Sequence, residues 1–197
     1  MPVKIAICGN IASGKSTVQN LLGKKGYKVL DTDEVAHSLL TVKNKPLYEA
    51  FKGYDFFDEN GEFSRYKVGQ HVFEHKEAGK LLTSIMHPQI KVKIQEFFEQ
   101  NKDEKLLFVG IPLLFEAKME NLFDKIIFVY ADDEIRLERL LKRNNYTIEH
   151  AKQRMASQLP QDEKVKKSDF VINNNGSISE LEKEIDDLFT QQSFLSV

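Results

Sequence analysis

Hydrophobic residues along the chain gather in five short runs that predict β-strands. The runs lie at residues 3–8, 27–30, 106–111, 125–130 and 168–173. Val, Ile and Phe recur in them, and these residue types favour strands. The run at 106–111 is continuously apolar, as expected of a central strand covered on both faces. Helical patterns separate the runs, so the alternation predicts an α/β fold with a parallel sheet.

Between and after these runs, apolar residues recur at three- and four-residue spacing, which predicts amphipathic helices. The clearest segments are 16–25, 133–143 and 178–189. We expect Thr147 to cap a further helix, and the tail from Gln191 to be frayed.

The stretch from residue 34 to 105 has helical patterning and no convincing strand, with punctuation at Pro46, Gly53, Gly61 and Pro88. It is far too long for a simple crossover between two parallel strands, so we interpret it as an inserted helical substrate-binding domain. Its histidines fit no zinc signature, and surface or capping roles are expected for them. The three considered as a possible metal site are His71, His75 and His87, and His37 lies in the same stretch.

The 197 residues carry a formal net charge of −2, so the chain lacks a basic footprint and no nucleic-acid partner is expected. No apolar run reaches transmembrane length, and the N-terminal residues enter a strand without the pattern of a secretory leader. The single cysteine, Cys8, excludes an internal disulfide framework and sits among apolar residues typical of a buried strand end. We expect a cytoplasmic protein without a membrane partner, and the oligomeric state stays open.

Residues 9–16, Gly-Asn-Ile-Ala-Ser-Gly-Lys-Ser, match the phosphate-binding P-loop pattern G-x-x-x-x-G-K-[ST]. The pattern lies between a strand and a helix, so the helix N-terminus faces an anion. Gly9 and Gly14 permit backbone geometries and close approaches that a Cβ would obstruct. Lys15 offers a positive charge to the β- and γ-phosphates, and the Ser16 hydroxyl is placed to ligate Mg²⁺. The sequence therefore predicts a nucleoside triphosphate site here.

Two carboxylates, Asp31 and Asp33, follow the second predicted strand. The carboxyl ends of parallel strands gather at one edge of a sheet, where the P-loop also lies. We interpret Asp33 as a catalytic base that accepts a proton from a substrate hydroxyl attacking the γ-phosphate. Asp31 is a candidate for the magnesium shell. The alternative for both is a cap on a helix that begins near Glu34.

Further charged residues leave two interpretations open. Glu116, at the end of the third strand, either contacts Mg²⁺ through water or caps the next segment. Arg136, Arg139 and Arg143 share a helix face. That face is either solvated or part of a lid that brings guanidinium groups onto the transferring phosphate.

With these residues assembled, the sequence resembles the dephospho-CoA kinase family, which are P-loop kinases of the nucleoside monophosphate kinase type. The P-loop alone identifies only a superfamily, but its combination with the other motifs at these distances is much more specific. Those motifs are Asp31-Thr32-Asp33, Ser64-Arg65, Val72-Phe73, His87-Pro88-Gln89-Ile90, Pro112-Leu113-Leu114-Phe115-Glu116, Arg139 with Arg143, Arg154 to Gln158, and Val171 to Gly176. The resemblance spans residues 1–185.

The resemblance implies a three-layer α/β/α fold with a central parallel sheet. It also implies that ATP phosphorylates the ribose 3′-hydroxyl of dephospho-CoA, giving CoA and ADP in the last step of CoA synthesis. The implied parts are a core at 1–33, 106–132 and 158–190, a substrate-binding insertion at 34–105 and a lid at 133–157.

Together with the residues above, the resemblance implies the following site. The catalytic residues are Asp33, Lys15 and Arg143; the ATP site is Gly9, Ala12, Ser13, Gly14, Lys15, Ser16, Thr17, Asn175 and Gly176; dephospho-CoA contacts Asp33, Arg65, His87, Pro112, Leu113, Leu114 and Arg139; and Mg²⁺ contacts Ser16 and Asp31.

The sequence departs from the family's usual pattern at several positions. Asn10 and Ala12 replace glycines of the loop. Ala adopts positive φ poorly, so we expect an ordinary conformation for Ala12. Ser64 replaces an acidic residue, and Asn144-Asn145 replaces Asp-Gly in the lid turn, a turn that Asn can also supply.

Two other functions deserve a test. The nearer is a kinase of another small acceptor, such as a nucleoside monophosphate or shikimate. A GTPase switch is suggested by Asp58-Glu59-Asn60-Gly61 and Asn101-Lys102-Asp103-Glu104. It is disfavoured because Glu104 stands where the guanine-reading Asp belongs, and because a helical pattern precedes it instead of a strand.

Overall fold

The computed structural model describes residues 1–143 and 146–190. The chain divides into two compact units. The first combines the residues up to Asp31 with those from Gln100 onward, and the second is Thr32–Glu99. The Asn144-Asn145 turn and the tail from Gln191 lie outside the described residues.

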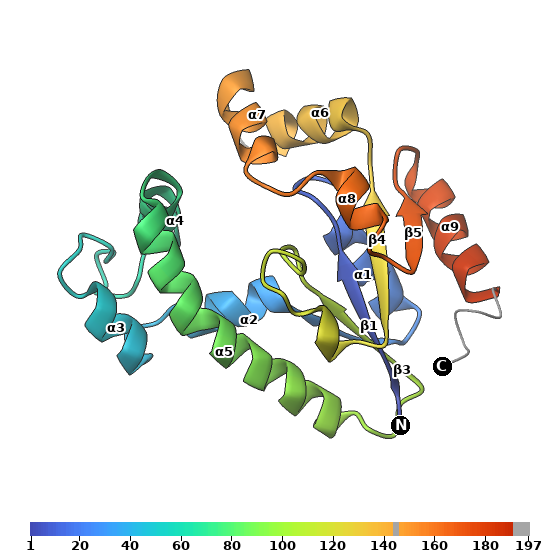
Figure 1. Ribbon diagram of the computed structural model, residues 1–197, viewed down its shortest axis with the longest axis horizontal. Helices are drawn as coiled ribbons and strands as arrows, with labels where there is room; N and C mark the ends of the chain where they lie inside the picture. The colour runs from blue at the N-terminus through green and yellow to red at the C-terminus, as the bar shows by residue number, and fades with distance from the viewer. Residues whose placement is uncertain (144–145, 191–197) are drawn as a thin grey trace. The chain divides into compact units, whose positions relative to one another are not determined.

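The first unit is built on a five-stranded sheet in which every neighbouring pair is parallel, with the order β2-β3-β1-β4-β5 (Figure 1). Its strands are β1 (Val3–Cys8), β2 (Lys28–Asp31), β3 (Leu106–Gly110), β4 (Lys125–Tyr130) and β5 (Phe170–Asn173). Gly110 on β3 lies opposite Ile7 on β1 and Asp31 on β2, so the carboxyl ends of these strands meet at one edge. The predicted α/β fold with a parallel sheet is confirmed.

Side chains of a strand alternate between the two faces of the sheet. Helices pack against the apolar side chains that this alternation presents. The helices of the first unit are α1 (Lys15–Lys24), α6 (Asp133–Arg143), α7 (Ile148–Ala156), α8 (Gln161–Val165) and α9 (Ile178–Thr190), with a short 3-10 helix at Glu120–Leu122. On one face, Ile5 and Phe108 form a core with Leu22 of α1 and Ile185 of α9. Thr147 caps α7 as predicted, accepting a hydrogen bond from the His150 N–H at 3.2 Å.

The second unit is helical, as its sequence predicts. Its helices are α2 (Thr32–Leu39), α3 (Lys45–Phe51), α4 (Arg65–Glu74) and α5 (Lys76–Gln100). Among its described residues, the only β-pairing outside helices is an isolated antiparallel bridge between Phe57 and Phe63. Leu47 and Phe51 of α3 and Val68 of α4 are buried. The expected bounds of the insertion, 34–105, stay a prediction.

Two local expectations are wrong. Pro88 lies inside α5 and does not interrupt it, because a proline removes a single backbone donor from a long helix whose other bonds remain. The second helix begins at Thr32 instead of Glu34, so Asp33 lies in its first turn. A carboxylate there is stabilised by the helix dipole without acting as the cap.

Among residues 1–143 and 146–190, none of the helices has the length and apolar character needed to cross a membrane.

Candidate active site

The P-loop links β1 to α1 and holds two residues in the left-handed backbone region. Gly14 has φ 97°. Ala12 has φ 63°, so the expectation of an ordinary conformation for Ala12 is wrong. The course of the loop overrides the preference of alanine, at a local cost of about 1–2 kcal/mol. Gly9 is needed for space, since a Cβ there would lie 2.4 Å from Ser13 Oγ and 2.8 Å from the Val129 carbonyl oxygen.

The second half of the loop is covered by the segment that follows β5. Asn174 is buried and donates from Nδ2 to the Ser13 carbonyl at 2.7 Å. A Cβ on Gly14 would lie 1.9 Å from the same nitrogen, so only glycine fits beneath Asn174. Arg139 of α6 donates to the Asn174 carbonyl at 2.8 Å and to the Ser13 carbonyl at 3.5 Å. Arg139 therefore spans the P-loop and the end of β5.

Lys15 opens α1 and is buried at the carboxyl edge of the sheet. Its ammonium donates to Gln19 Oε1 at 2.9 Å and lies 3.5 Å from Asp31 Oδ1 at the end of β2. The next residue, Ser16, is exposed in the first turn of the helix. A hydroxyl and a carboxylate are oxygen ligands of the kind Mg²⁺ prefers, so Ser16 and Asp31 suit that ion chemically.

The first half of the loop is tied to both ends of the predicted lid. Ile11 N–H donates to Gln158 Oε1 at 2.7 Å, and the Ile11 carbonyl accepts from Arg136 at 3.4 Å. Arg136, only 3% exposed, also pairs with Asp133 at 2.8 Å. Asn10 Nδ2 donates to the Leu159 carbonyl at 3.0 Å. A shift of α6 or of the 158–160 segment would therefore break or lengthen these hydrogen bonds to the loop.

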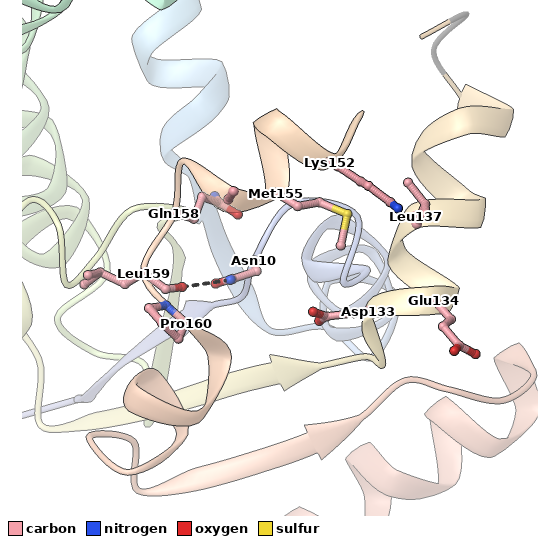
Figure 2. Close-up of a pocket in the computed structure, with 10 residues that line it drawn as sticks. Asn10, Asp133, Glu134, Leu137, Lys152, Met155, Gln158, Leu159 and Pro160 are labelled. Atoms are coloured by element: carbon pink, nitrogen blue, oxygen red, sulfur yellow. Dashed lines mark hydrogen bonds between the residues drawn. The ribbon is translucent and has the colours of Figure 1, made fainter. Parts of the chain in front are cut away.

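A cavity of about 570 Å³ lies between this part of the loop and helices α6 and α7 (Figure 2). Figure 2 shows Lys152 and Met155 of α7 on one side, Glu134 of α6 on another, and the Asn10–Leu159 hydrogen bond between the loop and the 158–160 segment. The cavity is lined by Asn10, Asp133, Glu134, Leu137, Lys152, Met155, Ala156, Gln158, Leu159 and Pro160.

The three arginines of α6 do not share one environment. Arg136 is buried and Arg139 contacts the P-loop, so a solvated face does not describe these two residues. Arg143 is exposed at the end of α6. Arg143 therefore differs from the other two in its exposure to solvent, and its role in a lid stays a prediction.

Most of the remaining predicted residues of the first unit lie at strand ends, and Thr17 lies in a helix. Asn175 accepts from the Asp132 N–H at 2.8 Å, and Gly176 is exposed beside it. After β3, Pro112 is partly buried, Leu113 is 43% exposed and Leu114 is fully buried. Thr17, in α1, donates its backbone N–H to the Gly14 carbonyl at 2.9 Å.

The second unit brings two predicted residues together. Asp33 of α2 and Arg65 of α4 line a cavity of about 320 Å³, together with Glu34, His37 and Ser38. Arg65 Nη1 lies 3.3 Å from His37 Nδ1. The cavity thus combines two carboxylates, a guanidinium and an imidazole, and its guanidinium is the group that can pair with an anion of a ligand.

His87 does not line that cavity. It is partly buried on α5, and burial, with a smaller effect of Lys91, lowers its pKa. In the same motif, Gln89 exchanges hydrogen bonds of 3.0 and 3.3 Å with Asn44, so it braces α5 against the segment before α3. Within the described residues, no group of three or more His, Cys, Asp or Glu side chains is arranged to hold a metal ion.

The site predicted from the sequence omits four polar residues that contact the P-loop region, although Arg136 is named there as part of a possible lid: Gln19, Arg136, Gln158 and Asn174. One signal for Gln19 was available, because it stands four residues after Lys15 and so shares its helix face. The other three lie far along the chain, and only the fold brings them to the loop.

The sheet is parallel with the order β2-β3-β1-β4-β5, and the P-loop joins its central strand β1 to α1, the helix that begins with Lys15. The chain therefore has a P-loop kinase fold. The fold is shared with shikimate kinase from Acinetobacter baumannii, with a TM-score of 0.55, 16% identity and coverage of 96% of this chain and 94% of that one. At this identity, the likeness concerns the fold alone.

Closer comparisons identify the family. The model of the family described as dephospho-CoA kinase matches residues 3–180. A dephospho-CoA kinase from Listeria innocua is 41% identical over 187 residues, covering 92% of each chain. The structure of the dephospho-CoA kinase from Campylobacter jejuni aligns with a TM-score of 0.70 and 33% identity over 96% of each chain. The chain belongs to the dephospho-CoA kinase family.

Proposed function

We propose that the chain transfers the γ-phosphoryl group of ATP to the ribose 3′-hydroxyl of dephospho-CoA, giving CoA and ADP as the last step of coenzyme A biosynthesis. The observation that carries the proposal is the P-loop of a dephospho-CoA kinase family member, with the Lys15 ammonium buried at the carboxyl edge of the sheet. Mg²⁺ as the metal ion and the cytoplasm as the compartment belong to the same proposal.

The donor side of the reaction is assigned to the first unit. Backbone N–H groups of residues 12–17 and the N-terminus of α1 surround the β- and γ-phosphates, and Lys15 adds a positive charge. Ser16 and Asp31 would hold Mg²⁺, which when bound neutralises phosphate charge. Asn175 and Gly176 are assigned to the adenine of ATP.

The acceptor side is assigned mainly to the cavity of the second unit. Asp33 accepts the proton of the 3′-hydroxyl, whose oxygen forms the new bond to the γ-phosphorus. The bond from that phosphorus to the β–γ bridging oxygen breaks, and its electron pair leaves with ADP. Arg65 pairs with phosphate of the acceptor. His87 and residues Pro112, Leu113 and Leu114 are assigned to the rest of the acceptor, while Arg139 and Arg143 stabilise the transferring charge.

A panel of acceptors tests the proposal. The purified chain is incubated with Mg-ATP and either dephospho-CoA, AMP or shikimate, and ADP release and product mass are measured. We expect ADP release that depends on dephospho-CoA, with CoA as the matching product. Release only with AMP or shikimate, or GTP binding without transfer to any acceptor, would overturn the proposal. Lys15→Met is the matched control and should lose transfer because it keeps the side-chain length without the charge.

A further inference from the structure

The side chain of Gln19 contacts the P-loop lysine without belonging to the P-loop motif. It lies one helical turn after Lys15 on α1, and its amide oxygen accepts the 2.9 Å hydrogen bond from the ammonium. Only 5% of Gln19 is exposed, so this contact is made out of water. A hydrogen bond from a charged donor in such a place is among the stronger ones in a protein.

The backbone of β3 provides the space for this amide. A Cβ on Gly110 would lie 2.3 Å from Gln19 Nε2 and 2.4 Å from Gln19 Cδ. Gly110 is the last residue of β3 and pairs with Asp31 in the sheet register. The amide group therefore lies against Gly110, whose partner in the sheet is the candidate Mg²⁺ ligand Asp31. It also contacts the P-loop lysine.

Packing alone does not account for an amide at this position. Gln19 Nε2 is buried and has no hydrogen-bond partner among residues 1–143 and 146–190. A buried donor left in this state destabilises the fold, whereas an apolar side chain of the same size would fill the space without that cost. The feature that an apolar side chain would lack is the hydrogen bond to Lys15.

The Lys15 ammonium thus has a neutral and an anionic neighbour. The amide oxygen lies at 2.9 Å, while the nearest Asp31 oxygen lies at 3.5 Å and makes the longer contact. Were the amide absent, the ammonium would gain most by closing on the carboxylate, because opposite charges attract strongly away from water. That ion pair would compete both with phosphate for Lys15 and with Mg²⁺ for Asp31.

We propose that Gln19 is a positioning residue that holds the Lys15 ammonium with a neutral acceptor and so prevents its capture by Asp31. The inference rests on the proposed function, since it concerns the same triphosphate site. When the triphosphate enters, the ammonium exchanges a neutral oxygen for phosphate oxygens, and Asp31 keeps its charge for the metal ion.

ATP binding to four variants tests the inference by calorimetry: Gln19→Leu, Asp31→Asn, the double variant, and Asn20→Leu. The last is the matched control, because it removes an exposed amide from the same helix. We expect Gln19→Leu to raise the Kd for ATP about tenfold, as the loss of one charge-assisted hydrogen bond predicts. Asn20→Leu should leave Kd unchanged.

The double variant separates positioning from packing. If Asp31 captures the lysine in the absence of the amide, Gln19→Leu should weaken ATP binding much less when Asn already replaces Asp31. An equal weakening in both backgrounds, or normal binding by Gln19→Leu, would overturn the inference. If the leucine variant does not fold, Gln19→Glu replaces it in the test, because glutamate keeps the shape of the glutamine side chain. A second carboxylate beside Lys15 should raise the Kd for ATP further than loss of the amide does. Unchanged ATP binding by Gln19→Glu would contradict the inference.

Turnover by the unaltered chain distinguishes the two proposals. If the unaltered chain makes CoA from dephospho-CoA but the Gln19 variants bind ATP normally, only the positioning role falls. If the unaltered chain transfers no phosphoryl group to dephospho-CoA, the proposed function is wrong, whatever the ATP affinities of the Gln19 variants are.

Discussion

The Lys164 ammonium lies 2.7 Å from Glu116 Oε1, and the lysine is only 1% exposed. The same carboxylate oxygen accepts the Leu159 N–H at 3.2 Å. Glu116 thereby joins the turn after β3 to α8 and to the segment that follows the predicted lid. These contacts give Glu116 a structural role, while the two roles considered from the sequence, a water-mediated contact with Mg²⁺ or a cap on the next segment, stay predictions.

Removing the charge of Glu116 should destabilise the fold. Glu116→Gln leaves the Lys164 ammonium buried without its counter-ion, and breaking such a pair costs about 3–5 kcal/mol when both partners are buried. Glu116 is partly exposed, so we expect a loss near the lower end of that range, measured as the free energy of unfolding in urea. Glu163→Gln, exposed on α8, should change little. Adding Lys164→Met should recover most of the loss, and a Glu116→Gln variant of normal stability would contradict the explanation.

Replacing Ala12 by Gly should stabilise the P-loop. The positive φ of Ala12 costs about 1–2 kcal/mol, whereas the extra freedom of glycine in the unfolded chain costs about 0.4–1 kcal/mol. We expect Ala12→Gly to raise the free energy of unfolding by up to about 1 kcal/mol. Ala156→Gly, at the end of α7, is the control and should lower it by about 0.5–1 kcal/mol. A loss of stability in Ala12→Gly would show that the loop tolerates alanine without strain.

The strands and the phosphate loop could be predicted because their signals are local. Apolar runs mark the strands, and the glycine and lysine spacing marks the loop. The predicted strands at 3–8 and 125–130 match β1 and β4 at both ends, while the other three differ from the structure by at most a few residues at their ends. Such ends depend on the neighbouring strand, which local sequence does not contain.

The conformation of Ala12 and the partners of Ser13 could not be predicted in the same way. Intrinsic preference argued against positive φ at Ala12, but the path between β1 and α1 decided it. Asn174 and Arg139 reach Ser13 from positions more than a hundred residues away, so the contact exists only in the folded sheet. The catalytic roles of Asp33, Lys15 and Arg143 and the contact of Arg65 with dephospho-CoA stay predictions.

Cys8 should resist alkylation in the folded chain. Burial, offset in part by Lys164, raises the pKa of the thiol from 9.0 to about 12. Iodoacetamide reacts with thiolate, so at pH 9 we expect slow modification of the native chain and rapid modification in urea, measured by mass spectrometry. Since the native pKa is the higher one, the neutral thiol favours the fold below pH 9, and this contribution should be lost between pH 9 and pH 12. Equal rates with and without urea would contradict the burial of Cys8.

Arg143→Ala should slow turnover without changing stability. Arg143 is exposed, so its loss should shift the free energy of unfolding by less than about 0.5 kcal/mol. Loss of a group that stabilises the transferring charge should lower kcat about a hundredfold. Lys142→Ala, which removes the neighbouring exposed cation paired with Glu138, is the control and should keep normal turnover. If Arg143→Ala unfolds the chain instead, the arginine is structural and the lid assignment is wrong.

Asp33→Asn should separate substrate binding from chemistry. The side chain is exposed in the first turn of α2 and lines the same cavity as Arg65, so the amide should leave the fold intact. An amide cannot accept the proton of the acceptor hydroxyl, and loss of a general base lowers turnover by about 10²–10⁴-fold. We therefore expect unchanged ATP affinity by calorimetry and a kcat reduced by at least about a hundredfold. The control is Glu34→Gln, which removes a neighbouring carboxylate from the same cavity and should keep kcat within a few-fold of normal. Similar losses of kcat in both variants would mean that the charge of the cavity, and not a base at Asp33, governs the rate.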